Sequence, residues 1–113
     1  MGGSSLGILK GTLEVLILKI LSPAPNHGYG IAQRLRKTSA ELFQVEEGAL
    51  YPALRRMEKK GLLRADWDVT DTGREARFYR LTAEGEHALR TSVEDWTRYV
   101  TAMNHVLEGG EGG

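Results

Sequence analysis

Hydrophobic residues recur at helical spacing in the first part of the chain. Over residues 9–21 they follow one another at intervals of three or four, which is typical of a helix with an apolar face. Val15 and Leu18 extend that face around much of the circumference, so this helix needs a second surface to cover it. Two prolines within residues 22–27 end the helix.

Two further helices follow at the same spacing. The pattern predicts a short helix over residues 28–38 and a longer one over residues 46–60, which Gly61 ends. Pro52 lies inside the longer helix and removes the backbone hydrogen bond to the Gly48 carbonyl, at a cost of roughly 3 kcal/mol. Such a cost indicates a required bend or a close backbone approach, unless the helix begins only at Pro52.

The pattern then becomes typical of β-strands. Residues 62–69 and 75–81 predict two strands, and residues 70–74 between them are rich in turn-forming types. Thr82 is suited to cap a final helix that ends near Leu107. Three helices, a β-hairpin and a long helix are the arrangement of a winged helix-turn-helix. The predicted fold class is therefore mainly α with a small β-hairpin, that is, α+β.

Six apolar residues form a heptad seam along the final helix, at alternating intervals of four and three. A chain of 113 residues has little other surface to cover this seam, so we expect it to form a homodimer together with Val15 and Leu18. Packing against its own domain is the alternative. Trp96 on the seam is usually a core residue, but near a dimer axis its ring could also stack on a planar ligand. The seam residues are Leu89, Val93, Trp96, Val100, Met103 and Leu107.

Composition narrows the class of protein further. The chain has no cysteine, no apolar run long enough to span a membrane and no signal-peptide pattern at its start, so we expect a cytoplasmic protein without membrane association. The predicted organisation is a winged-helix DNA-binding domain at 9–81 and a dimerisation helix at 82–108. Disordered tails are expected at 1–8 and 109–113, where glycine is frequent.

The charge distribution is more informative than the net charge, which is zero. Residues 27–80 contain eleven Lys or Arg and eight Asp or Glu, so a modest basic excess lies in the middle of the chain. Arginine is the commonest reader of guanine edges in the major groove of DNA. A solvated helix face and a hairpin of mixed surface charge are the alternatives. The candidate DNA-binding cations are Arg55, Arg56, Lys59 and Lys60 of the third helix and Arg74 and Arg77 of the hairpin.

No pattern of catalytic chemistry occurs in the sequence. The three histidines are too far apart to predict a metal site, and there is neither an acid pair nor a phosphate-binding glycine loop. We therefore expect no enzyme activity, no metal and no cofactor.

Five stretches of the chain resemble the PadR family of bacterial transcription regulators, in its short form with a single C-terminal helix. They occur in the family's order and spacing, and together they span most of the chain. The matching stretches are residues 9–13, 27–31, 47–54, 58–63 and 77–85.

The resemblance implies a homodimer built from the first and last helices, with residues 46–60 as the recognition helix and 62–81 as the wing. It also implies a near-palindromic double-stranded operator and repression of a nearby operon, relieved by a small-molecule effector. The DNA contacts that it implies fall on Tyr29, Gly48, Ala49, Tyr51, Pro52, Arg55, Gly73, Arg74 and Arg77.

One position departs from the family pattern. Many members have Ser or Thr where Glu46 stands, and Glu46 with Glu47 places two negative charges near the expected phosphates. The pair, together with the low net charge, motivates an alternative function. In that alternative the protein is a winged-helix module for protein interaction or ligand sensing, without strong DNA binding.

Overall fold

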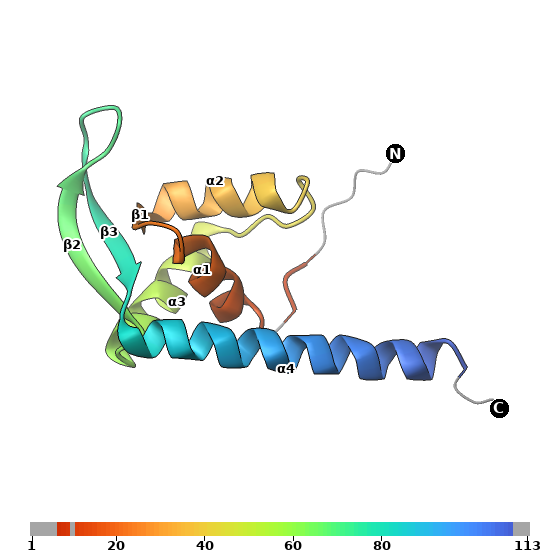
Figure 1. Cartoon of the computed structure of the whole chain (residues 1–113). Coiled ribbons are helices and arrows are strands. Elements are labelled where there is room, and N and C mark those ends of the chain that lie inside the picture. Colours follow the sequence, from red (N-terminus) through yellow and green to blue (C-terminus); the bar gives the residue numbers. More distant parts are fainter. Residues whose placement is uncertain (1–6, 10, 110–113) are drawn as a thin grey trace.

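Four helices and a three-stranded antiparallel sheet form the computed structural model, which describes residues 7–9 and 11–109 (Figure 1). The helices are α1 (Leu13–Leu21), α2 (Gly28–Thr38), α3 (Glu47–Lys59) and α4 (Ala83–Leu107). The strands are β1 (Asn26–His27), β2 (Leu63–Val69) and β3 (Glu75–Leu81), in the sheet order β1-β3-β2. The predicted α+β winged-helix fold is confirmed.

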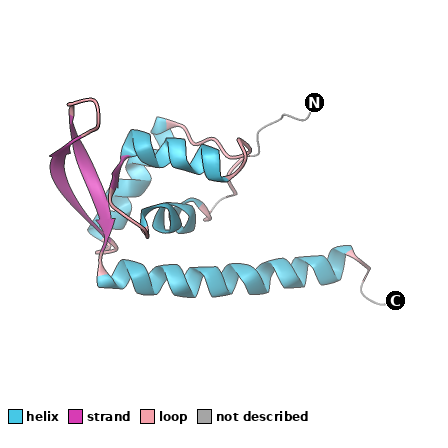
Figure 2. Ribbon diagram, turned by 45° about the horizontal axis from the view of Figure 1, so that its top comes forward, coloured by secondary structure: helices cyan, strands magenta, loops and turns pink. Residues whose placement is uncertain are grey.

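The three short helices and the base of the sheet share one hydrophobic core. Each helix contributes buried apolar residues at helical spacing, and the first residue of β2 and the buried tyrosine of β3 complete the core. The stripe of α3 is the predicted one, whereas Tyr29 of α2, which was expected to face the core, is 63% exposed. Figure 2 shows the hairpin standing beside these helices, while α4 runs along them and continues past them. The buried members are Ile17, Leu18, Ile20, Leu21, Ile31, Leu35, Leu50, Ala53, Leu54, Met57, Leu63 and Tyr79.

The first helix begins four residues later than its hydrophobic spacing predicted. Gly11 has a φ of +87°, a left-handed conformation that a helix does not continue through. The N–H of Thr12 donates to the carbonyl of Leu9 at 3.0 Å, which closes a turn ahead of the helix. Ile8 nevertheless packs against the core, although it lies in the predicted 1–8 tail. Residues 1–6 and 110–113 of the two predicted tails lie outside the described residues.

The sequence did not predict β1. It consists of two residues, which pair with Tyr79 and Phe78 of β3. The side chain of Asn26 accepts the N–H of His27 at 2.8 Å, and His27 Nδ1 accepts the N–H of Gly30 at 3.3 Å as the N-cap of α2. β1 therefore fixes the start of α2 to the sheet.

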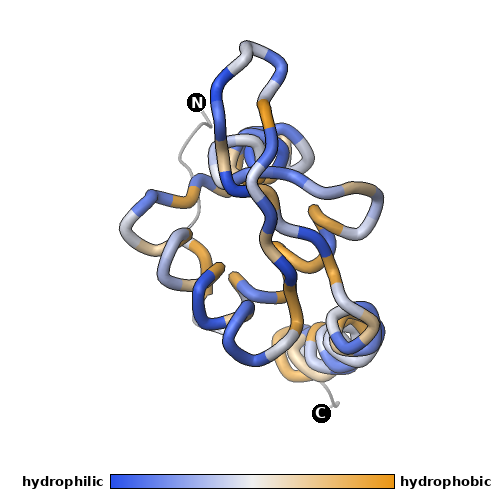
Figure 3. The backbone as a smooth tube through the Cα atoms, turned by 90° about the vertical axis from the view of Figure 1, so that its left-hand side faces the viewer, coloured by the Kyte–Doolittle hydropathy of each residue, from blue (hydrophilic) through white to orange (hydrophobic). Residues whose placement is uncertain are grey.

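The hairpin formed by β2 and β3 is the wing. Its strands pair in register from Leu63 opposite Leu81 to Val69 opposite Glu75. The N–H of Thr70 donates to the carbonyl of Arg74 at 2.8 Å, and the turn has Gly73 at a φ of +85°. The predicted turn at 70–74 is confirmed. Viewed from the side of the wing, its tip is mainly hydrophilic (Figure 3).

A small set of hydrogen bonds to backbone groups holds the end of α3 and the start of α4 together. Gly61 adopts a φ of +82°, and the N–H of Leu62 donates to the carbonyl of Met57 at 2.9 Å, which closes the last turn of α3. The Thr82 hydroxyl donates to the Gly61 carbonyl at 2.6 Å and accepts the N–H of Gly85 at 3.0 Å. Thr82 therefore caps α4, as predicted, and anchors it to the end of α3.

The long helix α4 contacts the core only through its first half. It packs on α1 and β3 there, and its second half projects away from the rest of the chain (Figure 1). At its end the N–H of Gly109 donates to the carbonyl of Val106 at 3.1 Å. None of the helices in the described part of the chain is long and apolar enough to cross a membrane.

Candidate nucleic-acid interface

The outward face of α3 is open. Leu50, Ala53, Leu54 and Met57 face the core, so helical geometry places a second line of residues on the opposite side. This outward line consists of Gly48, Pro52, Arg55 and Lys59. The helix begins at Glu47, so the alternative in which it begins at Pro52 is wrong. Glu46 takes the N-cap position but its side chain makes no capping hydrogen bond.

The cations of α3 divide into two groups. Arg55 and Lys59 of the outward line are exposed and form no ion pair with any residue that the structure describes. Lys60 Nζ lies 2.9 Å from Glu14 Oε1 on α1, and Arg56 Nε lies 3.8 Å from Glu14 Oε2. One carboxylate of α1 therefore holds two of the four cations that were predicted to meet DNA.

This cluster leads to a prediction for the Glu14→Gln variant. Arg56 and Lys60 are released from Glu14, so affinity for DNA of every sequence should rise. Each added phosphate contact steepens the plot of log affinity against log salt by about 0.9, so two released cations steepen it by up to about 2. Fluorescence-anisotropy titrations at several salt concentrations measure both effects.

The Glu41→Gln variant is the matched control for that experiment. It also removes one negative charge, but Glu41 pairs with Arg36 at 3.5 Å, away from α3. An equal change of slope in both variants would show that only net charge matters and that Glu14 does not restrain the two cations.

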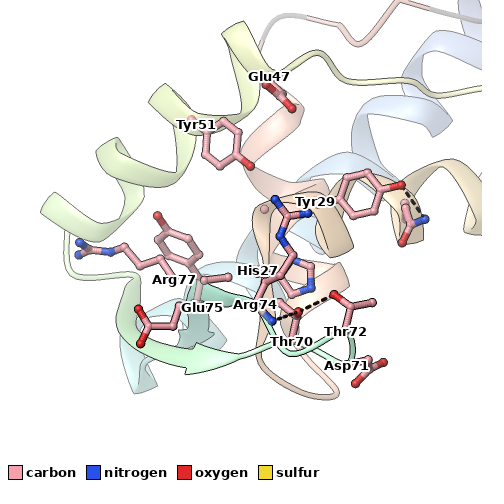
Figure 4. Close-up of a pocket in the computed structure, with 14 residues that line it drawn as sticks. His27, Tyr29, Glu47, Tyr51, Thr70, Asp71, Thr72, Arg74, Glu75 and Arg77 are labelled. Carbon is pink, nitrogen blue, oxygen red and sulfur yellow. Dashed lines mark hydrogen bonds between the residues drawn. The ribbon is translucent and has the colours of Figure 1, made fainter.

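An open hollow lies between α2, α3 and the wing. Tyr51 from α3 and Tyr29 from α2 project toward it, and the guanidinium of Arg74 extends into it from the wing (Figure 4). Thr70 and Thr72 line its floor and share a hydrogen bond of 3.1 Å. Hydroxyl groups and the Arg74 guanidinium, which come from three parts of the fold, thus line one space. Such donors suit the oxygen atoms of a phosphate backbone.

The start of α2 packs closely against α3. A Cβ added at Gly28 would overlap the ring of Tyr51, so any other residue there would have to displace that ring. The Tyr29 hydroxyl, exposed on the next residue, accepts a hydrogen bond from Gln33 Nε2 at 3.3 Å. Beneath them, burial raises the pKa of Tyr79, with Arg77 opposing the shift, so the phenol of Tyr79 remains neutral near pH 7.

The charge of the hollow is not strongly basic. Glu47, Asp71 and Glu75 line it together with Arg74 and Arg77. Arg77 Nη2 also donates to Glu58 Oε2 of α3 at 2.7 Å, and both side chains are partly exposed. Arg77 thus has a carboxylate partner within the chain, and this ion pair bridges the wing and α3. The contact of Arg77 with phosphate stays a prediction. Arg74, with Gly73 at the tip, forms no ion pair in the described ranges.

The seam of α4 is largely exposed in the single chain. Val93, Trp96, Met103 and Leu107 are 45%, 43%, 41% and 73% exposed, whereas Leu89 packs against the core. The rings of Trp96 and Tyr99 stack with centroids 5.8 Å apart. Both rings line a groove between α4 and α1, whose other wall includes Glu14 and the half-buried Val15.

The prediction that Leu18 takes part in dimerisation is wrong. Leu18 is only 2% exposed because it belongs to the hydrophobic core of the same chain. The wide apolar face of α1 is therefore partly covered within the chain, and Leu18 offers no surface to a partner.

Several residues that shape these surfaces had no signal in the sequence. Glu14 and Glu58 each sit in a helix as ordinary acidic residues, and their partners lie on other elements. His27 lies at a predicted helix start and in one of the stretches that resemble the family, but its contacts were not predicted. It caps α2 and packs edge-on against Phe78, with ring centroids 5.1 Å apart. Tyr99 could have been noticed from its spacing, three residues after Trp96.

The comparisons with known proteins agree with this geometry. The profile of the Transcriptional regulator PadR-like family matches residues 17–91. A transcriptional regulator of Mycobacterium tuberculosis is 39% identical over 77 residues, which cover 66% of this chain and 68% of the relative. The crystal structure of a PadR-like transcriptional regulator from Bacillus cereus is similar, with a TM-score of 0.77 and 33% identity over 89% of this chain and 96% of that one. A PadR family transcription regulator from Clostridium difficile gives a TM-score of 0.75 and 31% identity over 86% and 99%.

A winged helix with an open α3 and a long C-terminal helix is the fold of a DNA-binding transcriptional regulator. The chain belongs to the PadR-like family of transcriptional regulators. The resemblance seen in the five sequence stretches is thereby confirmed, and the family is one of regulators rather than of enzymes.

Proposed function

We propose that the protein acts as a homodimer that binds a near-palindromic operator and represses a nearby operon until a small molecule releases it. The observation that carries the proposal is the outward line of α3. Arg55 and Lys59 stand there on an exposed helix and pair with no carboxylate of residues 7–9 or 11–109. The hollow with Arg74, Tyr29 and Tyr51 lies beside them. In this arrangement α3 reads base edges and the hollow holds the neighbouring phosphates.

The roles of the side chains follow from their surroundings. Arg55 has donors for guanine, while Ala49 and Pro52 offer apolar surface to a thymine methyl group. Arg74 at the wing tip and the hydroxyls of Tyr29 and Tyr51 hold phosphates. Because the lining of the hollow includes three carboxylates, the phosphate contacts rely on hydrogen bonds more than on charge.

The exposed seam of α4 supports the homodimer. A second copy would cover Val93, Trp96, Val100, Met103 and Leu107, which the single chain leaves partly open. Val15 of α1 borders the same groove. A two-fold dimer would then present two α3 helices to successive major grooves about 34 Å apart.

The groove between α1 and α4 supports a small-molecule effector. The stacked rings of Trp96 and Tyr99 form a flat apolar wall, and Glu14 and Asp95 add carboxylates to the lining. Because both carboxylates already pair with cations of the same chain, stacking on the two rings is the attraction that a planar ligand would find here. Quenching of tryptophan fluorescence by planar compounds, in a Trp67→Phe background, would report its binding.

Arg55→Ala tests base reading by α3. We expect it to weaken binding to the selected operator by about 1–3 kcal/mol while leaving binding to unrelated DNA nearly unchanged. Arg74→Ala should instead weaken binding to both DNAs equally. It should also lower the slope of log affinity against log salt by about 1, the value for one lost phosphate contact. Titrations against operator and scrambled duplexes separate the two behaviours.

Arg98→Ala is the matched control, because Arg98 is exposed on α4 and pairs with Asp95 of the same helix. It removes one positive charge at a site far from α3 along the chain. If Arg55→Ala and Arg98→Ala weaken operator binding equally, α3 does not read bases. If the unaltered protein shifts no DNA from its own upstream region at low salt, a protein-interaction module is the better explanation.

A further inference from the structure

We infer that the backbone carbonyl of Gly48 reads a base amino group in the major groove. This inference rests on the proposed function, because it takes α3 as the helix that enters the groove. It adds a hydrogen-bond acceptor to the outward line of α3, whose side chains are donors or apolar.

The Gly48 carbonyl lacks its regular hydrogen-bond donor within α3, because the residue four positions later is a proline. In a regular helix the carbonyl of residue 48 accepts the N–H of residue 52. Residue 52 is proline, which has no N–H, and it lies inside α3. The pyrrolidine ring also crowds the carbonyl four residues earlier and pushes it away from the helix axis. The Gly48 carbonyl therefore lacks its regular helical donor.

Gly48 lies at the surface, in an open groove that it lines with Pro52 and, on the other side, with Leu9. Gly48 is exposed, and a Cβ added there would meet no atom within 4 Å. Without a side chain at this position, another backbone or a base edge can approach closely. The same line carries Pro52, which has no polar side chain, and Arg55 and Lys59, which only donate. The carbonyl is thus the acceptor that the outward line presents.

The chemistry of the major groove defines what such an acceptor can bind. The donors there are the amino groups N6 of adenine and N4 of cytosine. Residues 48 and 55 are about 10 Å apart along the helix, which corresponds to about three base steps. Arg55 would select a guanine, and the Gly48 carbonyl would select a base with an amino group within about three base pairs of it.

The test begins with selection of a binding site for the unaltered protein from random duplex DNA. Each adenine or cytosine of that site is then replaced by an analogue in which hydrogen takes the place of the amino group. At one position we expect the loss of the amino group to weaken binding of the unaltered protein about tenfold. The Pro52→Ala variant has the N–H again, so the same loss should weaken its binding less than twofold.

A matched pair of variants isolates the single N–H. The first variant has alanine at position 52. The second has the α-hydroxy acid analogue of alanine there, so that an ester bond without an N–H replaces the peptide bond. The ester variant should still bind about tenfold more weakly when the amino group is removed. Arg55→Ala should show the same tenfold loss, but it should no longer prefer guanine. Thermal unfolding by circular dichroism checks that Pro52→Ala remains folded.

Each alternative result has a definite meaning. The inference fails if Pro52→Ala remains sensitive to the loss of the amino group. It also fails if the ester variant is as insensitive as the alanine variant. In either case the carbonyl does not contact the base, and Pro52 acts only through its apolar ring or its effect on the shape of α3. If a site is selected but no amino group matters, the inference fails while the proposed function stands. If selection yields no site, the proposed function fails, and the inference fails with it.

Discussion

Val100→Glu is expected to convert the protein into a monomer. Val100 lies at the centre of the α4 seam, half-buried in the single chain, between Trp96 and Met103. In a two-fold dimer the change would bury two carboxylates close to each other in an apolar seam, without partners, and each buried charge carries a penalty of several kcal/mol. Sedimentation velocity at micromolar concentration should show a single species of about half the original mass.

The same variant should lose most of its affinity for a two-half-site operator. A dimer binds its second half-site intramolecularly, which raises affinity by a factor of about 10² to 10⁴. A monomer loses this gain even though α3 and the wing are unchanged. Binding to a single half-site should therefore differ little between Val100→Glu and the unaltered protein.

Thr101→Glu provides the matched control, since it adds the same charge one residue later. Thr101 is exposed and lies about a third of a turn away from Val100. It should remain dimeric with its operator affinity retained. A dimeric Val100→Glu protein would show that the seam does not form the interface.

Gly85→Ala is expected to lower the free energy of unfolding by about 3 kcal/mol, the upper end of what overpacking costs. Gly85 is the buried residue of α4, and a Cβ there would overlap the carbonyl oxygen of Leu62. That oxygen belongs to the backbone and also accepts the N–H of Thr82 at 3.1 Å, so it has little freedom to move. Either α4 or the connection from α3 to β2 must shift.

The chain offers its own control in Gly48→Ala. Gly48 also lies in a helix, but a Cβ there meets open space, so alanine should raise the free energy of unfolding by about 0.5–1 kcal/mol. Urea unfolding followed by circular dichroism measures both variants. Equal stability of the two alanine variants would mean that α4 is not anchored tightly through Gly85.

Much of the fold is predictable because its determinants are local. The apolar stripe of α3 repeats every three or four residues, and the Thr82 cap and the Gly61 stop act on backbone groups a few residues away. The turn at 70–74 depends on five consecutive residues. The start of α1 was missed because apolar spacing continues to Leu9, while the left-handed conformation of Gly11 interrupts the helix.

The candidate site was predictable only in outline. The sequence identified a basic α3 and a wing. It could not distinguish Arg55 and Lys59, which pair with no carboxylate in the part of the chain that the structure describes, from Arg56, Lys60 and Arg77, which do. Glu14 and Lys60 are 46 residues apart and Arg77 and Glu58 are 19 apart. No local pattern relates such positions.

The sequence by itself determined the order of the four helices and the two wing strands, the buried stripe of α3 and the apolar seam of α4, because periodicity and capping depend on neighbours along the chain. Only the tertiary structure decided that Leu18 is covered, that β1 joins the sheet and which cations are neutralised. These outcomes depend on distances between elements that are remote in sequence. A long charged side chain binds whichever carboxylate the packing of those elements brings within reach.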